Sequence, residues 1–298
     1  MDLNTSIDKK YIYKYLCTSQ HPKGIIYISH GMAEHIGRYK WIVNKLINDG
    51  YHVFAIDHRG HGNRIMNNEL GFFFDVNGWE LVVNDLCEFI KSSRKDYPNL
   101  NTYLLAHSMG SWIALSAMQK GLNINGLILS GSSKQIKPLL IIQKFIVNFN
   151  VLLYGKRGIS KFIDEISLGQ YNKKFKPNRT KKDWISSDND NVDDYVEDPL
   201  CGFMVTNGLW RDLINGLLDV FKKNKYKRTK INTPILLISG SLDPVGENGK
   251  GVKRLELFLR SIYTNVSSIL VDDARHEVFS ETSKESSYNK LLKFIGNI

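Results

Sequence analysis

The sequence predicts an α/β protein with a doubly wound, mostly parallel sheet. Short apolar runs recur along the chain, and their near-continuous apolarity is typical of strands buried on both faces of a parallel sheet. Amphipathic stretches with helical spacing lie between most of these runs, and strand alternating with helix favours doubly wound topology. At 298 residues the chain is long enough for one such core with an insertion.

The expected strands and helices alternate in chain order. The apolar runs that predict strands are 11–16, 24–29, 51–56, 102–106, 126–130, 234–239 and 267–271. The stretches with helical spacing are 38–48, 78–96, 109–120, 247–262 and 282–295. Each run is long enough for a strand and too short for most helices.

One interval breaks this alternation. Residues 133–232 separate two expected strands and are far more numerous than an ordinary crossover requires. We therefore predict a first part of the core in 1–132, a cap or lid insertion in 133–232, and a second part of the core in 233–298. The insertion begins with the amphipathic stretch 138–154 and ends in 201–221, which is expected to return to the core as a helix.

The chain carries a formal net charge of +10, concentrated in 171–182 and 221–230. A basic run is most often a solvated surface, and no nucleic-acid recognition motif accompanies it, so we expect no nucleic-acid partner. Weak peripheral contact with anionic membranes is the expectation that would suit a lipid substrate. The sequence leaves the oligomeric state open.

The cysteine pattern and the apolar segments bear on the compartment. Cys17, Cys87 and Cys201 are widely spaced and odd in number, which suits a reducing compartment. Residues 1–16 lack the apolar core of a secretory signal. The most apolar stretch, 138–155, is interrupted by polar residues and falls short of the ~20 apolar residues that span a bilayer. We therefore expect a soluble, cytoplasmic protein.

The segment "AHSMG" (106–110) places Ser108 in a variant of the nucleophile-elbow motif G-x-S-x-G, with Ala106 at the first glycine position. The motif requires a strand, a sharp turn and a helix, and the expected strand 102–106 and helix 109–120 supply that context. Crowding at the turn requires small flanking residues, which Ala106 and Gly110 are. The pentapeptide by itself is equally compatible with a serine that only caps a helix.

Two further loops supply the residues that a serine nucleophile needs. Asp243 follows the expected strand 234–239, and His276 follows the expected strand 267–271. Loops at the carboxyl ends of parallel strands gather at one edge of a sheet. A histidine can accept the serine proton, and a carboxylate can orient the histidine. We therefore predict a catalytic triad of Ser108, Asp243 and His276, preferring Asp243 over Asp272 and Asp273, which lie on the histidine loop itself.

Acyl transfer also requires donors for the negative charge that develops on the carbonyl oxygen. We expect these to be the backbone N–H groups of Met109, which follows the nucleophile, and of Met32, in the loop after the strand 24–29. Gly31 would permit close approach of the backbone to the substrate. This chemistry implies no metal and no organic cofactor.

Five motifs together resemble the monoacylglycerol lipase and lysophospholipase-like branch of the α/β-hydrolase superfamily, in its bacterial form. They are "HGMAEHIGRY" (30–39), "DHRGHG" (57–62), "AHSMGS" (106–111), "SGSLDPVG" (239–246) and "ARHEVF" (274–279). The resemblance covers almost the whole chain. It implies an α/β-hydrolase fold with eight strands, a helical cap between strands 6 and 7, and hydrolysis of carboxylic esters that carry an acyl chain.

The resemblance assigns the same roles to Ser108, Asp243, His276, Met32 and Met109. It also implies that the loop 57–62 supports the oxyanion loop, so His58, Arg59 and His61 are expected to be structural. The chain departs from the family at Ala106 and at "NRIMNN" (63–68), and the second departure puts substrate contacts of that loop in doubt.

The stretch 138–155 carries an apolar stripe at helical spacing, which includes Phe145 and Phe149. We expect these two residues to contact the substrate in an acyl channel. The alternative is that the stripe only packs the lid onto the core, and the two roles are compatible.

The sequence therefore predicts a serine carboxylic-ester hydrolase that acts on acyl lipids such as monoacylglycerol or lysophospholipid. Two alternatives stay open. The same triad could act on a thioester or an aminoacyl amide, or the chain could be a non-catalytic ligand-binding protein with a hydrolase fold.

Overall fold

The computed structural model describes residues 5–6 and 10–298. Residues 1–4 and 7–9, which belong to the segment without the apolar core of a secretory signal, lie outside the described residues. The centre of the fold is an eight-stranded sheet with the strand order β1-β2-β4-β3-β5-β6-β7-β8. All neighbouring strands from β4 to β8 are parallel, and β1 and β2 are antiparallel. The strands are β1 (Thr5–Ser6), β2 (Ile12–Tyr15), β3 (Gly24–Ser29), β4 (Tyr51–Ile56), β5 (Thr102–His107), β6 (Gly126–Ser130), β7 (Ile235–Gly240) and β8 (Val266–Val271). This architecture confirms the predicted α/β-hydrolase fold.

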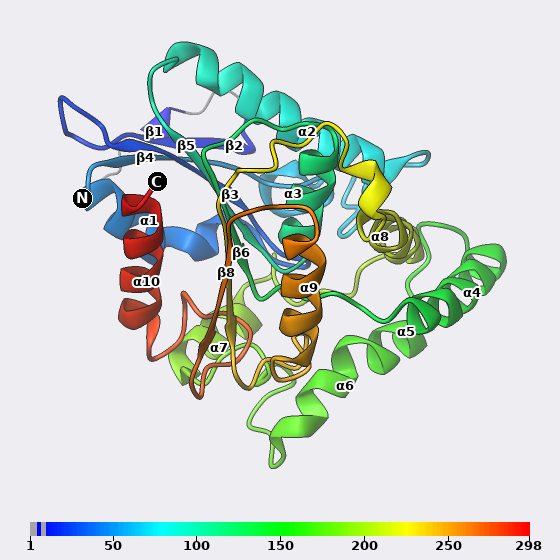
Figure 1. Ribbon diagram of the computed structural model, residues 1–298. Coiled ribbons are helices and arrows are strands. Elements are labelled where there is room, and N and C mark those ends of the chain that lie inside the picture. Colours follow the sequence, from blue (N-terminus) through cyan, green and yellow to red (C-terminus); the bar gives the residue numbers. More distant parts are fainter. Residues whose placement is uncertain (1–4, 7–9) are drawn as a thin grey trace.

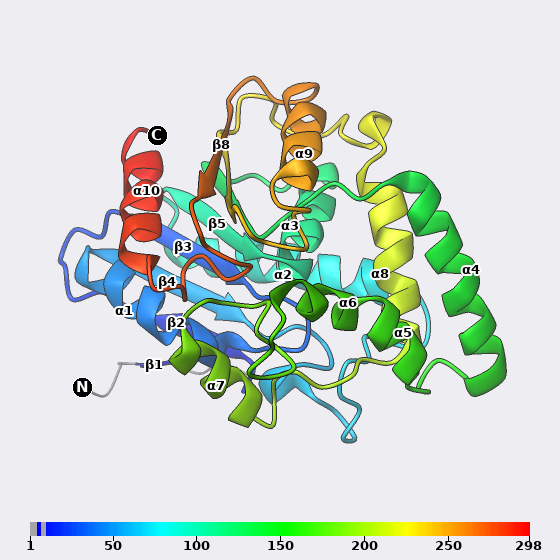
Figure 2. The same cartoon turned by 90° about the horizontal axis from the view of Figure 1, so that it is seen from below.

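Helices cover both faces of the sheet (Figures 1 and 2). One face packs against α1 (Lys40–Asn48) and α10 (Lys284–Gly296). The other packs against α2 (Gly78–Ser93), α3 (Met109–Gln119) and α9 (Lys250–Arg260). Helix α9 begins three residues later than the spacing predicts, because Glu247, Asn248 and Gly249 have positive φ angles that a helix does not accommodate.

The central strands are buried on both faces, as their apolar sequences predict. In β3, Ile25 and Tyr27 belong to one hydrophobic core, and Ile26 and Ile28 belong to the other. All four side chains are fully buried. Successive side chains of a strand point to opposite faces, so a continuous apolar run is what a strand between two helical layers requires.

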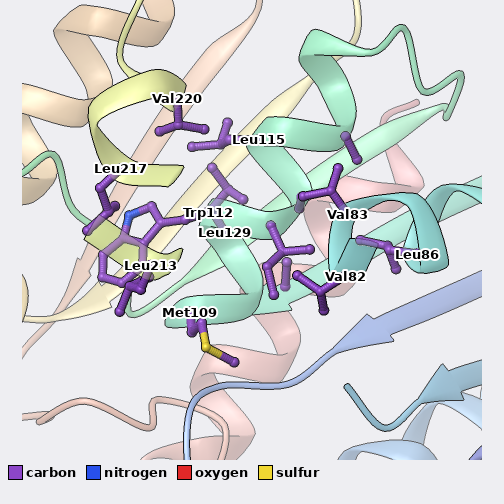
Figure 3. Packing of buried hydrophobic residues seen from close by; sticks show 14 of the residues in the cluster. Val82, Val83, Leu86, Met109, Trp112, Leu115, Leu129, Leu213, Leu217 and Val220 are labelled. Atoms are coloured by element: carbon purple, nitrogen blue, oxygen red, sulfur yellow. The ribbon is translucent and has the colours of Figure 1, made fainter. Parts of the chain in front are cut away.

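The segment between β6 and β7 forms a helical cap. Its helices are α4 (Lys137–Tyr154), α5 (Lys161–Ile166), α6 (Leu168–Asn172), α7 (Asn189–Glu197) and α8 (Asn207–Val220). Helix α8 returns to the core as predicted, since Leu213, Leu217 and Val220 share a hydrophobic core with Trp112 and Leu115 of α3 (Figure 3).

Helix α4 lies on the outer side of α8, and α5 and α6 lead from it toward α7 (Figures 1 and 2). No helix among the described residues is long and apolar enough to cross a membrane. Cys17, Cys87 and Cys201 are free thiols, with Cys17 and Cys201 buried.

The strand order determines where loops diverge. From β3 the chain moves to β4 on one side, and β5 then occupies the other side of β3. The loops that follow β3 and β5 therefore leave the sheet on either side of a crevice, which is where open α/β sheets bind ligands. Met32 follows β3 and Ser108 follows β5, so both stand at this crevice.

Candidate active site

Ser108 occupies a sharp turn between β5 and α3. Its φ of 50° and ψ of −120° lie outside the regions that L-residues favour. A Cβ atom at Gly110 would lie 2.3 Å from the carbonyl oxygen of Ser29, so only glycine fits where the helix passes β3. Ala106, at the position of the motif's first glycine, is fully buried in the core, which accommodates its methyl group.

His276 and Asp243 form a buried pair at the carboxyl ends of β8 and β7. The His276 Nδ1 atom lies 3.1 Å from the Asp243 Oδ1 atom. Asp243 also accepts hydrogen bonds from the Val245 backbone N–H at 2.9 Å and the Ser239 hydroxyl at 3.1 Å, which fix its orientation. Asp272 and Asp273, the competing acids on the histidine loop, are exposed to solvent.

The environment of His276 favours its protonated form. Burial opposes a charge on the imidazole, but the charge and hydrogen bond of Asp243, with Glu277 and Glu34 beyond it, outweigh burial and raise the pKa of His276. A base whose pKa lies above its ordinary value accepts a proton readily, provided that it starts neutral.

Ser108 and His276 line the same cavity of about 370 Å³. The ring of His107, the residue before Ser108, lies 4.7 Å from the ring of His276, centroid to centroid. No hydrogen bond joins the Ser108 hydroxyl to His276 within residues 5–6 and 10–298. Such bonds are often long in ligand-free enzymes and tighten when substrate binds.

Met32 and Met109 both line this cavity, and a Cβ atom at Gly31 would lie 3.2 Å from the Cβ atom of Ser108. Within the described chain, neither the Met32 nor the Met109 backbone N–H donates to another protein group. Two amides without acceptors beside the same serine are available to a substrate oxygen.

A buried ionic network holds the loop that carries Met32. Glu34 accepts hydrogen bonds from the Gly31 backbone N–H and, at 2.9 Å, from the Tyr39 hydroxyl. Arg38 lies 3.8 Å from Glu34 and 2.6 Å from Glu277, measured nitrogen to oxygen. Burial and the charge of Glu277 raise the pKa of Glu34 to about 7, against the opposing effect of Arg38.

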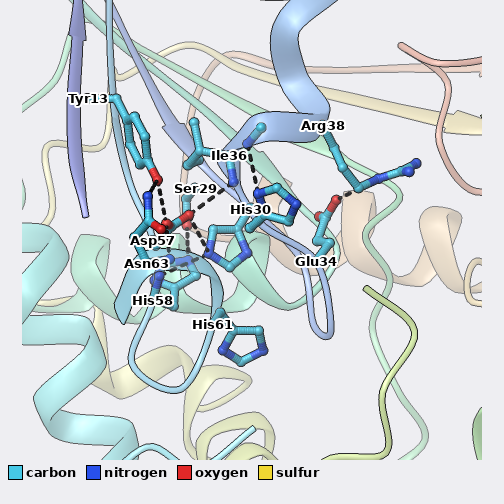
Figure 4. A network of polar contacts seen from close by, with 12 residues as sticks. Tyr13, Ser29, His30, Glu34, Ile36, Arg38, Asp57, His58, His61 and Asn63 are labelled. Atoms are coloured by element: carbon cyan, nitrogen blue, oxygen red, sulfur yellow. Dashed lines mark hydrogen bonds and ion pairs between the residues drawn. The ribbon is translucent and has the colours of Figure 1, made fainter. Parts of the chain in front are cut away.

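A second polar network supports this loop from below (Figure 4). Asp57 accepts hydrogen bonds from the Ile36 backbone N–H at 3.0 Å and the Tyr13 hydroxyl at 2.7 Å. His30 Nδ1 donates to the Gly31 carbonyl, because its Nε2 atom accepts the His58 backbone N–H at 2.9 Å. The residues 57–62 thus hold the backbone on which Gly31 and Met32 lie.

His58 and His61 are buried, and Arg59 pairs with Asp85. None of these three side chains lines the cavity, which agrees with the structural role that the resemblance implies.

The cavity has an apolar arm between α3, α4, α5 and α8. The residues that line this arm are Trp112, Leu139, Leu140, Ile146, Val147, Ile163, Trp210, Leu213, Ile214 and Leu217. The polar amide of Gln143 lies on the same face of α4.

Phe145 and Phe149 do not line this cavity, contrary to the prediction. Their side chains are 72% and 60% exposed on the outer face of α4. At about 100° per residue, both point away from Gln143 and Val147, which face the cavity. The apolar stripe encircles much of the helix, and its spacing alone does not tell which side faces the core.

His35, Asp198 and Cys201 bring three potential metal-ligand atoms within 4.8 Å of one another. His35 Nε2 lies 2.8 Å from Asp198, and its Nδ1 atom accepts the Gly37 backbone N–H. Both ring nitrogens are therefore occupied by protein groups, and the pair of His35 and Asp198 joins the loop 30–39 to the end of α7.

Sequence reasoning misses several residues around the triad. Glu34 and Arg38 lie four residues apart in the motif 30–39, and Glu277 follows His276 directly, so their positions are detectable but their pairing is not. The cap supplies Tyr171, Trp184 and Tyr195, which reach the site from a segment without any motif.

Comparison with known proteins identifies the family of this chain. The family model described as "Serine aminopeptidase, S33" matches residues 20–283. Monoglyceride lipase of Homo sapiens is 29% identical over 256 residues, which are 84% of this chain and 75% of the relative. Monoglyceride lipase of Rattus norvegicus is 30% identical over 241 residues, with 79% and 71% covered.

Among solved structures, a carboxyl esterase from Bacillus coagulans in complex with glycerol superposes with a TM-score of 0.88 and 25% identity, covering 100% of this chain and 99% of that chain. The sequence matches extend over core and cap alike. This chain therefore belongs to the serine aminopeptidase S33 family of α/β-hydrolases and is a relative of the monoglyceride lipases.

Proposed function

We propose that this chain hydrolyses carboxylic esters of acyl lipids, with monoacylglycerols as the favoured substrate class. Ser108 is the nucleophile, His276 the general base and acid, and Asp243 the residue that orients His276. The backbone N–H groups of Met32 and Met109 form the oxyanion hole. Phe145 and Phe149 are left out of the substrate site because they face away from the cavity.

The reaction follows from these positions. His276 takes the Ser108 proton as the serine oxygen attacks the ester carbon, and the carbonyl oxygen receives hydrogen bonds from the two amides. His276 then donates that proton to the departing alcohol oxygen, which leaves an acyl-enzyme. A water molecule, deprotonated by His276, releases the fatty acid and restores Ser108.

One observation carries the proposal. A serine in a strained turn, a buried histidine paired with a carboxylate, and two unpaired amides converge on one cavity with a long apolar arm. An acyl chain suits this arm because its lining consists almost entirely of aliphatic and aromatic side chains. The names of the relatives in Homo sapiens and Rattus norvegicus support monoacylglycerol as the ester.

Ser108→Ala tests the proposal. We expect hydrolysis of 1-monolauroylglycerol to fall by at least about 10⁴-fold, because no other group can form the acyl-enzyme. The unmodified protein should also gain the mass of a fluorophosphonate adduct, and Ser108→Ala should not. Ser261→Ala, an exposed serine on the end of α9, is the control and should keep full activity. Equal hydrolysis by Ser108→Ala would overturn the assignment.

We also propose that the outer face of α4 contacts an anionic lipid surface. Phe145 and Leu152 are 72% and 80% exposed there, which is unusual for large apolar side chains. Lys137 and Lys144 line a groove beside Phe145. Apolar side chains flanked by lysines suit the boundary between acyl chains and anionic headgroups.

Two further assignments are proposals of the same kind. We place the chain in the cytoplasm, which the three free cysteines support. We divide the chain into core residues 1–132 and 233–298 and cap residues 133–232, which the position of α4–α8 between β6 and β7 supports.

A further inference from the structure

Tyr171, on the cap helix α6, lines the cavity that Ser108 and His276 share. Its ring centroid lies 5.3 Å from that of Trp184, and the ring of Trp184 lies 5.0 Å from that of His276. The three rings form a continuous row from the cap to the imidazole. In this row, Trp184 lies between Tyr171 and His276.

Tyr171 is partly buried, and its hydroxyl makes no hydrogen bond to another protein group within residues 5–6 and 10–298. Burial, with the charges of Asp243 and Glu247, raises the pKa of Tyr171. The hydroxyl therefore stays protonated at neutral pH and can donate a hydrogen bond. An unsatisfied donor in a binding cavity is suited to a polar group of the ligand.

Two parts of the cavity differ in chemistry. The arm between α3, α4 and α8 is lined mainly by apolar side chains, with Gln143 as an exception. On another part of the wall, polar groups come from Gln170, Tyr171 and Lys174 of the cap and Glu247 of the core. During acylation His276 must reach the oxygen of the departing alcohol. The side chains stacked next to His276 therefore lie toward the alcohol part of an ester, and the apolar arm lies toward its acyl part.

We propose that Tyr171 is a specificity-determining residue that donates a hydrogen bond to a free hydroxyl of the leaving alcohol. The site then favours esters of polyols such as glycerol over esters of simple alcohols with the same acyl chain. This inference rests on the proposed ester hydrolysis and deepens it.

Tyr171→Phe tests the inference with two esters of one fatty acid, 1-monolauroylglycerol and methyl laurate. The substitution keeps the ring that packs on Trp184 and removes only the hydroxyl. We expect kcat/KM for monolauroylglycerol to fall about three- to tenfold, as for the loss of one hydrogen bond, with methyl laurate unchanged. The preference for the glycerol ester should fall by the same factor.

Tyr154→Phe is the matched control, because Tyr154 lies at the exposed end of α4 outside the cavity, and it should leave both rates unchanged. Thermal unfolding midpoints should agree among the three proteins. Equal loss on both esters would show that Tyr171 has only a structural role. No loss would show that its hydroxyl does not contact the alcohol part of the substrate. Either result overturns this inference and leaves the proposed ester hydrolysis standing. If the unmodified protein hydrolyses neither ester, the proposed function is overturned with it.

Discussion

At the scale of single residues, the properties of His276 depend on its neighbours. The imidazole is buried, which by itself would disfavour its charged form, and Asp243 reverses that preference through a 3.1 Å hydrogen bond. Asp243 in turn is held by Ser239 and Val245. The orientation and the proton affinity of the base thus depend on one carboxylate.

Asp243→Asn should therefore change both the rate and its pH dependence. We expect kcat/KM to fall by roughly 10⁴-fold, because the amide no longer favours the tautomer and charge that the imidazole needs. His276 acts as a base only when neutral, so activity of the unmodified protein should be lost as the pH falls through its raised pKa. In the variant the charge and hydrogen bond of Asp243, which are the main contributions against burial, are lost and only the smaller effects of Glu277 and Glu34 remain, so the acid limb should move to lower pH.

A kcat/KM profile from about pH 5 to 9 measures this shift. Asp272→Asn, which removes an exposed carboxylate from the histidine loop, should change neither the rate nor the limb. An acid limb that stays in place in Asp243→Asn would contradict the role given to Asp243.

At the scale of elements, helix α4 shows how far the sequence could predict the site. Strands, core helices and the serine turn depend on local patterns and motifs, so they are predictable to within a few residues. The facing of α4 depends on contacts with α8 and the cavity, which lie far away in the sequence. Apolar residues occur around most of its circumference, so Phe145 and Phe149 could not be distinguished from Leu140 and Val147 by spacing.

The same limit applies to Tyr171. Helix α6 is five residues long and carries no motif, and its place beside Trp184 results from the path of the whole cap insertion. Ser108, Asp243 and His276, by contrast, each follow a predictable strand.

Gln143→Leu tests which side of α4 faces the cavity. The Gln143 amide lies on the wall of the cavity among apolar residues, and no described group hydrogen-bonds to it. An acyl chain that passes this amide displaces its water, which costs on the order of 1 kcal/mol. We therefore expect the variant to raise kcat/KM for a palmitoyl ester about threefold or more and to leave a butyryl ester unchanged. Asn289→Leu, a comparable change on the exposed face of α10, should raise neither rate; a palmitoyl rate that is not raised in Gln143→Leu would contradict this facing.

At the scale of the whole molecule, two lysines and several exposed apolar side chains coincide on α4. Lys137 and Lys144 flank Phe145 on α4, and α10 lies on the opposite side of the sheet (Figures 1 and 2). This asymmetry would orient the cap toward an anionic surface, with the arm of the cavity directly beneath α4.

The double substitution Lys137→Gln/Lys144→Gln should weaken binding to vesicles of phosphatidylcholine and phosphatidylglycerol. At about 1 kcal/mol per lysine, two lysines correspond to about thirtyfold in the partition constant measured by cosedimentation. Binding to phosphatidylcholine alone should not change. Lys290→Gln/Lys293→Gln on α10 removes equal charge from the other side and serves as the control. Equal weakening by both pairs would indicate a general charge effect and no oriented contact.

The cap is attached to the core unevenly. Its segment around α7 is held against the loop 30–39, since the Tyr195 hydroxyl and the Gly202 backbone N–H both donate to the Ala33 carbonyl, and Asp198 pairs with His35. Helix α4, in contrast, rests chiefly on α8 through side-chain packing. The α7 side of the cap is therefore tied to the loop 30–39 by polar contacts, whereas α4 itself contacts its neighbours chiefly through apolar packing on α8. We expect bulky lipids to enter past α4, while the backbone N–H groups of Met32 and Met109 keep their positions beside Ser108.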